Sequence, residues 1–179
     1  MNDHPTPRSY PAALTAARVI LRFLIPLNIL LGVAILSLLV ASLVSPGLMN
    51  AVVGGRRLEG HSGVILGMRL LAVIGICVAP LAHIVYTRLL AILGSVRAAN
   101  PFLTENAVRL QTIAWALVGL QLLNLGARAV SVSASTKAFP LHVDGGSFVI
   151  GWLAVLLVFV LARVFDHGAK LREDLEGTV

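Results

Sequence analysis

The sequence has little charge and almost no cysteine. Only 12% of its 179 residues are Asp, Glu, Lys or Arg, against about 25% in an average soluble domain. Its one cysteine, Cys77, cannot form a disulfide within the chain, which excludes a small secreted scaffold held together by disulfides. Hydrophobic residues make up 58% of the chain. A soluble protein of this size could not bury so much apolar surface, so the composition predicts an integral membrane protein.

The sequence contains long apolar runs. A helix needs about 20 mainly apolar residues to span a bilayer. Four stretches approach or exceed that length, at residues 19–44, 64–86, 113–130 and 148–165. Lipid offers the backbone no hydrogen-bond partner, so these unbroken runs must be helices. We therefore predict an all-α fold, an integral membrane four-helix transmembrane bundle with antiparallel neighbours.

Four spans place both chain ends on one side of the membrane. Nine Lys or Arg residues fall on that side and five on the other. Cytoplasmic segments carry the excess of basic residues, which predicts an N-in/C-in arrangement. Residues 1–18 then form a cytoplasmic arm, residues 19–165 the membrane domain and residues 166–179 a cytoplasmic tail. Topology accounts for the net charge of +6, so we expect no direct binding of nucleic acid.

Polar side chains inside a span need a protein partner or a route to water. Gln121, Asn124 and Arg128 recur at intervals that place them on one stripe of the third span. Together with Arg69 they are candidates for a polar ligand-binding site near the outer leaflet. The alternatives are hydrogen bonds between helices, and arginine side chains that extend to the lipid headgroups.

One face of the second span carries small residues. Gly75 and Ala79 allow a neighbouring helix to approach closely, and His83 continues the same face. We expect His83 to be a buried, hydrogen-bonded residue rather than a ligand. We also expect Cys77, which lies within this apolar run, to pack as a small hydrophobic residue.

The sequence offers no assembled active site. No span contains Asp or Glu, which disfavours a proton-coupled exporter. A phosphate-binding loop, a nucleophile motif and a clustered set of metal ligands are also missing. We therefore predict a protein that is not an enzyme, with no catalytic residues, no metal and no cofactor.

The most distinctive polar segment joins the second and third spans. Asn100-Pro101 predicts a turn and Thr104 the start of the next helix. Glu105 and Arg109 have the spacing of an ion pair along that helix. The segment is either a well-specified helix connector or part of a docking surface for a cytoplasmic partner.

The tail after the fourth span has helical spacing too. Asp166 and Lys170 are four residues apart, which predicts that the helix continues past the membrane. The tail is either a solvated helix end or the second half of the docking surface. The residues proposed for that surface are Asn100, Phe102, Glu105, Asn106, Arg109, Arg172, Glu173, Asp174 and Glu176.

The same two segments carry a family resemblance. Asn100-Pro101-Phe102, followed by Asn106 and Arg109-Leu110, resembles the inner-loop signature of a bacterial membrane family, domain of unknown function 2975. Residues 164–179 resemble the family's C-terminal signature, and the likeness extends over residues 15–179. It implies four helices in the bacterial inner membrane but no reaction, because the family has none assigned. Family members are often encoded beside a small helix-turn-helix regulator, which implies a cytoplasmic transcriptional regulator as partner.

Two classes of function follow. The first is a regulatory or interaction protein that binds such a regulator through the inner loop and the tail. The second is a small-molecule or lipid-binding membrane protein, a transporter or an immunity protein, that uses Arg69, Gln121, Asn124 and Arg128. The lipid bilayer is a partner in both. Assembly into a homo-oligomer or a larger membrane complex stays open.

Overall fold

The computed structural model describes residues 12–44, 62–97, 104–135 and 148–176. Within these ranges the chain forms four α-helices: α1 (Ala12–Val44), α3 (Ser62–Arg97), α4 (Thr104–Ala134) and α5 (Phe148–Glu176). Each helix is long and apolar enough to cross a membrane. The predicted all-α, four-helix transmembrane class is therefore confirmed.

The helices continue beyond the apolar runs that predicted them. α3 has 36 residues and α4 has 31, whereas about 20 residues cross the hydrocarbon core. α1 already begins at Ala12, inside the predicted N-terminal arm, and α5 continues to Glu176 as predicted for the tail. Hydropathy detects only the part of a helix that lies in lipid, so the polar turns at the ends escape it.

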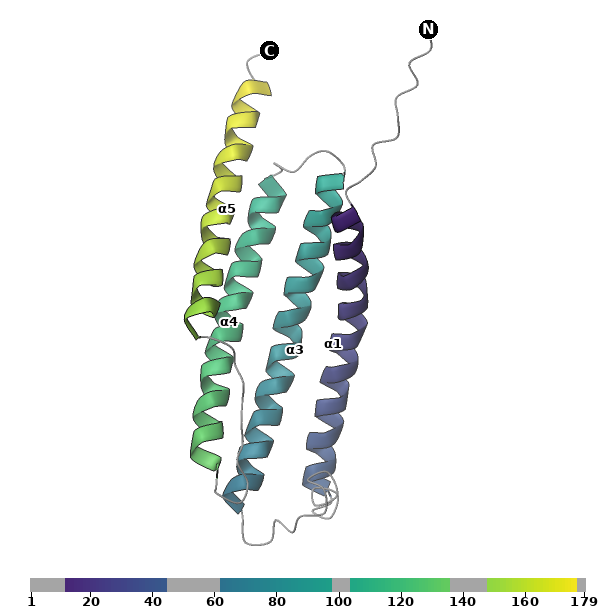
Figure 1. Cartoon of the computed structure of the whole chain (residues 1–179), viewed down its shortest axis with the longest axis vertical. Coiled ribbons are helices and arrows are strands. Elements are labelled where there is room, and N and C mark those ends of the chain that lie inside the picture. The colour runs from purple at the N-terminus through teal and green to yellow at the C-terminus, as the bar shows by residue number, and fades with distance from the viewer. Residues whose placement is uncertain (1–11, 45–61, 98–103, 136–147, 177–179) are drawn as a thin grey trace.

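The helices lie side by side in chain order. α1 packs against α3, α3 against α4 and α4 against α5, and no other pair of the described helices is in contact. Figure 1 shows a single layer of antiparallel neighbours, with the start of α1 and the end of α5 at the same end. We call this end, which also holds the end of α3 and the start of α4, the terminal end. The bundle is thus an open row, which lipid permits because it solvates apolar faces that water would drive together.

Small residues set the separation of α1 and α3. A Cβ atom added to Gly32 would lie 3.2 Å from the Cβ of Ala79, and one added to Gly75 would lie 3.3 Å from Ile35 Cδ1. Across this contact Asn28 Nδ2 donates a hydrogen bond to the Ala79 carbonyl oxygen at 2.9 Å. The close approach predicted from Gly75 and Ala79 is confirmed.

Two expectations for α3 need correction. The buried Nδ1 of His83 has no hydrogen-bond partner among the described residues, so the expected bond is not made at that atom. Cys77 is exposed rather than packed in the interior. Cys77 is exposed because α1 and α4 cover opposite sides of α3, which leaves the remaining surface of a single-layer row to the lipid.

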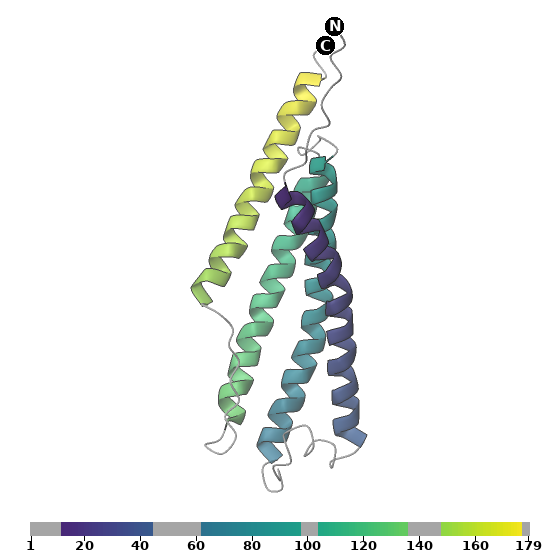
Figure 2. The ribbon, with the colours of Figure 1, turned by 45° about the vertical axis from the view of Figure 1, so that its right-hand side comes forward.

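α5 is displaced along α4. Gly151, near the start of α5, lies against the side chain of Gln121 in the middle of α4, and a Cβ atom at Gly151 would overlap it. Nearer the terminal end, the rings of Trp115 and Phe159 meet edge to face, with centroids 5.5 Å apart. α5 therefore covers only the first half of α4 and projects past Thr104 (Figure 1). Figure 2 shows that α5 is also inclined to the other helices.

Contacts between antiparallel neighbours show which charged residues lie at the same height, meaning the same position along the long axis of the helix row. Phe159 contacts Trp115, so Arg163, four residues later on α5, is level with the residue four before Trp115 on α4. The same reasoning from the α1–α3 and α3–α4 contacts brings Arg22 and Arg88 to this height. All three arginines are exposed. We call Arg22, Arg88 and Arg163 the arginine belt.

The arginine belt marks one limit of the apolar layer, and Arg69 lies at the other. Arg69 and Arg88 are both on α3, 19 positions apart. At about 1.5 Å per residue this separation is roughly 28 Å, close to the ~30 Å hydrocarbon core of a bilayer. This is the separation expected if the belt lies at the membrane boundary of the terminal end.

Candidate functional site

A chain of hydrogen bonds joins α3 to α4 at the terminal end. Ser95 Oγ donates to the Ile92 carbonyl oxygen at 2.8 Å and accepts from Asn106 Nδ2 at 2.6 Å. Asn106 Oδ1 accepts from Arg109 Nη1 at 2.9 Å. Arg109 Nη2 in turn forms an ion pair with Glu105 Oε2 at 2.7 Å, as its spacing predicts. We call Ser95, Asn106, Arg109 and Glu105 the hairpin network.

Asn106 is the centre of the hairpin network. Its exposure is 0%, and it is the largest fully buried side chain among the described residues. A buried amide is stable only when its polar atoms are hydrogen-bonded, so its bonds on both sides hold the start of α4 against the end of α3. This corrects the predicted docking surface, because Asn106 cannot touch a partner while it is buried. It positions neighbouring residues instead.

Other members of the predicted docking surface remain accessible. The Glu105 side chain is 72% exposed and that of Arg109 23%. Arg172 is exposed on the projecting part of α5. Lys170 Nζ forms the predicted ion pair with Asp166 Oδ2 at 2.9 Å on the same projection. Asn100 and Phe102 lie outside the described residues. Glu173, Asp174 and Glu176 belong to α5, but the structure does not describe their side chains.

Arg69, predicted for the ligand site, is engaged with α1. Its Nε donates to Ser42 Oγ at 2.9 Å and its Nη2 to the Ser42 carbonyl oxygen at 2.6 Å. Ser42 is buried and stands in the last turn of α1, where carbonyl groups lack a donor within the helix. The positive guanidinium also meets the negative end of the helix dipole. Arg69 therefore caps the neighbouring helix.

The other three residues of that predicted site lie on α4. Gln121 packs against Gly151 of α5, while Asn124 and Arg128 both have interaction partners in the protein. α3 stands between α1 and α4, so the guanidinium of Arg69 is turned away from this stripe. The structure therefore divides the four-residue set instead of assembling it.

Metal-binding groups do not gather in the described part of the chain, where no three His, Cys, Asp or Glu side chains could hold an ion together.

The comparisons with known proteins give a family and no activity. A family model described as "Protein of unknown function (DUF2975)" matches residues 66–179, more than half of the chain. The chain belongs to the DUF2975 family. No curated protein and no solved structure matches it.

The DUF2975 match begins within α3, whereas the resemblance was expected to begin near residue 15. The hairpin network and all of α5 lie inside the matched region, and α1 lies outside it. The contact between Arg69 and Ser42 crosses the limit of the match, because Ser42 belongs to α1. The chain is thus a multi-pass membrane protein of a family of unknown function, with α1 packed beside the DUF2975 region.

Sequence reasoning missed two partners in these clusters, Ser95 and Ser42. Each is a hydroxyl near the end of an otherwise apolar helix. A single serine near the end of an apolar helix is common. It can be recognised as a hydrogen-bond partner only when the polar residue that faces it on the neighbouring helix is known. Asn106 and Arg69 were recognised as polar, but their partners depend on helix pairing that one span cannot reveal.

Proposed function

We propose that this protein is a non-enzymatic protein of the bacterial inner membrane that docks a small cytoplasmic regulator at its terminal end. The projection of α5 past the other helices carries the proposal (Figure 1). There the helix leaves the apolar layer and exposes Lys170, Leu171 and Arg172. A helix that continues into water beyond a membrane protein is accessible to a soluble partner.

The hairpin network supports the proposal by giving the docking surface a rigid second side. It holds the first turn of α4 in place and leaves Glu105 exposed. The arginine belt lies just inside this surface. Because basic residues favour the cytoplasmic boundary, the belt supports an N-in/C-in orientation.

The polar groups within the spans support a role without catalysis. Asn28 and Arg69 are used in contacts between α1 and α3, and Gln121 packs against α5. The same contacts argue against the alternative ligand site near the outer leaflet. A site that needs Arg69 would first have to break its two bonds to Ser42.

The partner's chemistry follows from the charge of the tail. Glu173, Asp174 and Glu176 give the end of α5 an acidic sequence. The basic recognition helix of a helix-turn-helix regulator would meet these carboxylates instead of DNA phosphates. The protein would then hold a transcriptional regulator at the membrane without binding DNA itself.

Photocrosslinking in the native cell tests this proposal. A photoreactive residue replaces Leu171 (65% exposed) on the projection of α5, and in a matched control it replaces Val149 (71% exposed) at the start of the same helix. We expect a DNA-binding protein in the adduct at position 171 only. Neutralising the tail, by Glu173→Gln, Asp174→Asn and Glu176→Gln together, should abolish that adduct. Adducts only to lipid or to the chain itself at position 171, or an adduct unchanged by neutralisation, would refute the proposal.

A further inference from the structure

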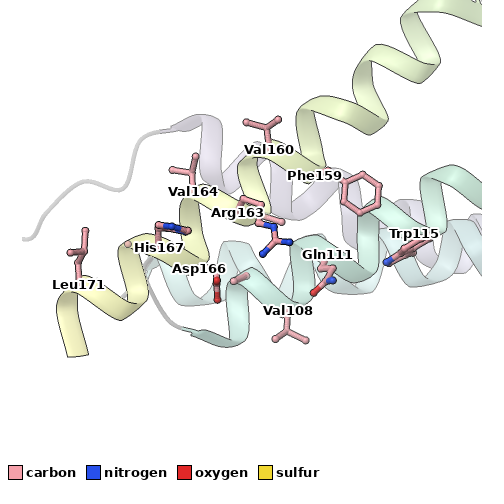
Figure 3. A pocket seen from close by; sticks show the side chains of 13 residues that line it. Val108, Gln111, Trp115, Phe159, Val160, Arg163, Val164, Asp166, His167 and Leu171 are labelled. Atoms are coloured by element: carbon pink, nitrogen blue, oxygen red, sulfur yellow. The ribbon is translucent and has the colours of Figure 1, made fainter. Parts of the chain in front are cut away.

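A groove of about 1010 Å³ runs between α4 and α5 near the terminal end. Figure 3 shows Arg163 and Asp166 of α5 pointing toward Val108 and Gln111 of α4. Leu171, the crosslinking position on the projection of α5, lines this groove too, whereas none of the residues predicted for the docking surface or for the outer-leaflet site does. Its lining combines aromatic, aliphatic and charged side chains, and these are not mixed at random.

Aromatic residues line one end of the groove. The polar and titratable residues Gln111, Arg163, Asp166 and His167 lie nearer the terminal end, beside aliphatic residues that include Val108, Val164 and Leu171. Trp115 and Phe159 form the apolar end, where their rings pack edge to face. Gln111 and Arg163 each lie four residues nearer the terminal end, which is about 6 Å along a helix axis. Arg163 belongs to the arginine belt, so the polar residues begin at the boundary of the apolar layer and the aromatic end lies inside it. A phospholipid has the same order of groups, with its phosphate above its acyl chains.

The charges of the groove favour an anion. Asp166 lines it, but its carboxylate is paired with Lys170 Nζ at 2.9 Å. Arg163 makes no hydrogen bond or ion pair with any residue that the structure describes. An exposed guanidinium beside a neutralised carboxylate leaves a net positive charge. Arginine is suited to phosphate because its planar N–H groups can donate two parallel hydrogen bonds.

We propose that this groove binds one anionic phospholipid of the leaflet at the terminal end. The phosphate lies at Arg163 and Gln111, and an acyl chain lies along Trp115 and Phe159. The aromatic pair fills the deep end, and the guanidinium selects the charge of the headgroup. The two proposals share Leu171, which lines the groove. The lipid is selected at Arg163 and Gln111, however, and the docking partner at the acidic tail, so each proposal is tested by its own variants.

Quenching of Trp115 fluorescence by brominated lipid tests the site in the full-length chain. The second tryptophan, Trp152, does not line the groove and is replaced by Phe so that Trp115 alone reports. The protein is reconstituted in vesicles that contain brominated phosphatidylglycerol or brominated phosphatidylcholine. One basic residue near an anionic headgroup corresponds to a preference of about fivefold, so we expect the anionic lipid to quench at an about fivefold lower mole fraction.

Two variants make the test specific. Arg163→Gln should bring the preference to about one, because the guanidinium is lost. Arg22→Gln removes an exposed arginine at the same height outside the groove, and it should leave the preference intact. The proposal is overturned if the parent protein shows no preference, if Arg163→Gln keeps it, or if both variants lose it equally. Loss of the preference on addition of millimolar inorganic phosphate at constant ionic strength would also overturn it, because the ligand would then be a soluble anion.

Discussion

Arg69 on α3 donates two hydrogen bonds to Ser42 on α1, one to its hydroxyl oxygen and one to its carbonyl oxygen. A single side chain thereby joins two helices and satisfies the end of one of them. An arginine near the end of a span is often explained by extension toward the headgroups. Here the same residue type serves as a cap supplied by the neighbouring helix.

Removal of this cap should destabilise the protein. We expect Arg69→Leu to lower the free energy of unfolding by about 2 kcal/mol, because a buried carbonyl loses a charged donor. Ser42→Ala should have a smaller effect, since the bond to the carbonyl oxygen remains. Thermal unfolding in detergent, with Arg88→Leu as an exposed control on the same helix, measures both. Unchanged stability of Arg69→Leu would show that the cap is dispensable and would reopen Arg69 as a ligand residue.

The hairpin network leads to a comparison of adjacent positions. Asn106→Ala should lower the free energy of unfolding by about 2 kcal/mol, because Ser95 and Arg109 lose a buried partner. Glu105→Ala breaks only the exposed ion pair with Arg109, four positions along the same helix. Such a pair contributes about 0.3–0.5 kcal/mol to the free energy of unfolding. Chemical unfolding followed by circular dichroism distinguishes them. Equal effects of the two substitutions would contradict the structural role of Asn106.

The contact between Gly32 and Ala79 limits the size of the side chain on α1. Gly32→Leu should force α1 away from α3 at a cost of about 2 kcal/mol, because a rigid Cβ already stands 3.2 Å from the added atom. Gly63→Leu is the control, since nothing lies within 4 Å of a Cβ at Gly63. Hydrogen exchange measured by mass spectrometry should become faster in α1 for the first variant only. Equal exchange in both would show that the helices are not closely packed there.

The orientation can be measured at exposed positions near the two ends. Cys77 is first replaced by Ser, which leaves the chain without a native thiol. Leu171→Cys and Ser133→Cys then place single thiols at the terminal end and near the end of α4, respectively. A membrane-impermeant maleimide should label the position 133 variant in spheroplasts and the position 171 variant only after the membrane is opened. The reverse pattern would place the termini outside the cell.

Hydropathy predicts the helices because lipid leaves the backbone no alternative, and the spacing of Gly75 and Ala79 predicts a close neighbour. The sequence does not predict which helix each polar side chain contacts. The polarity of Arg69 and Gln121 indicates that each needs a partner, but not that one turns to α1 and the other to α5. The polarity of its segment predicts that Asn106 lies on the surface, whereas the packing of α4 on α3 buries it and brings it to Ser95.

The groove between α4 and α5 had a faint signal in the sequence. Trp115 lies four residues after Gln111, and Arg163 four after Phe159, so each helix carries an aromatic and a polar residue on one face. The two pairs are almost 50 positions apart in the chain. Whether the two pairs face each other depends on how far α5 is displaced along α4, and the lengths of the spans do not determine this displacement.

The open row gives the protein an unusually simple order of assembly. Among the described helices, each packs only on its neighbours in chain order. No contact between these helices waits for a distant part of the chain, so each hairpin can form as soon as its second helix has entered the membrane. Of the four described helices α5 is made last, and it covers only the first half of α4. Its insertion therefore forms the groove, and a lipid already present in the membrane can occupy it at that moment.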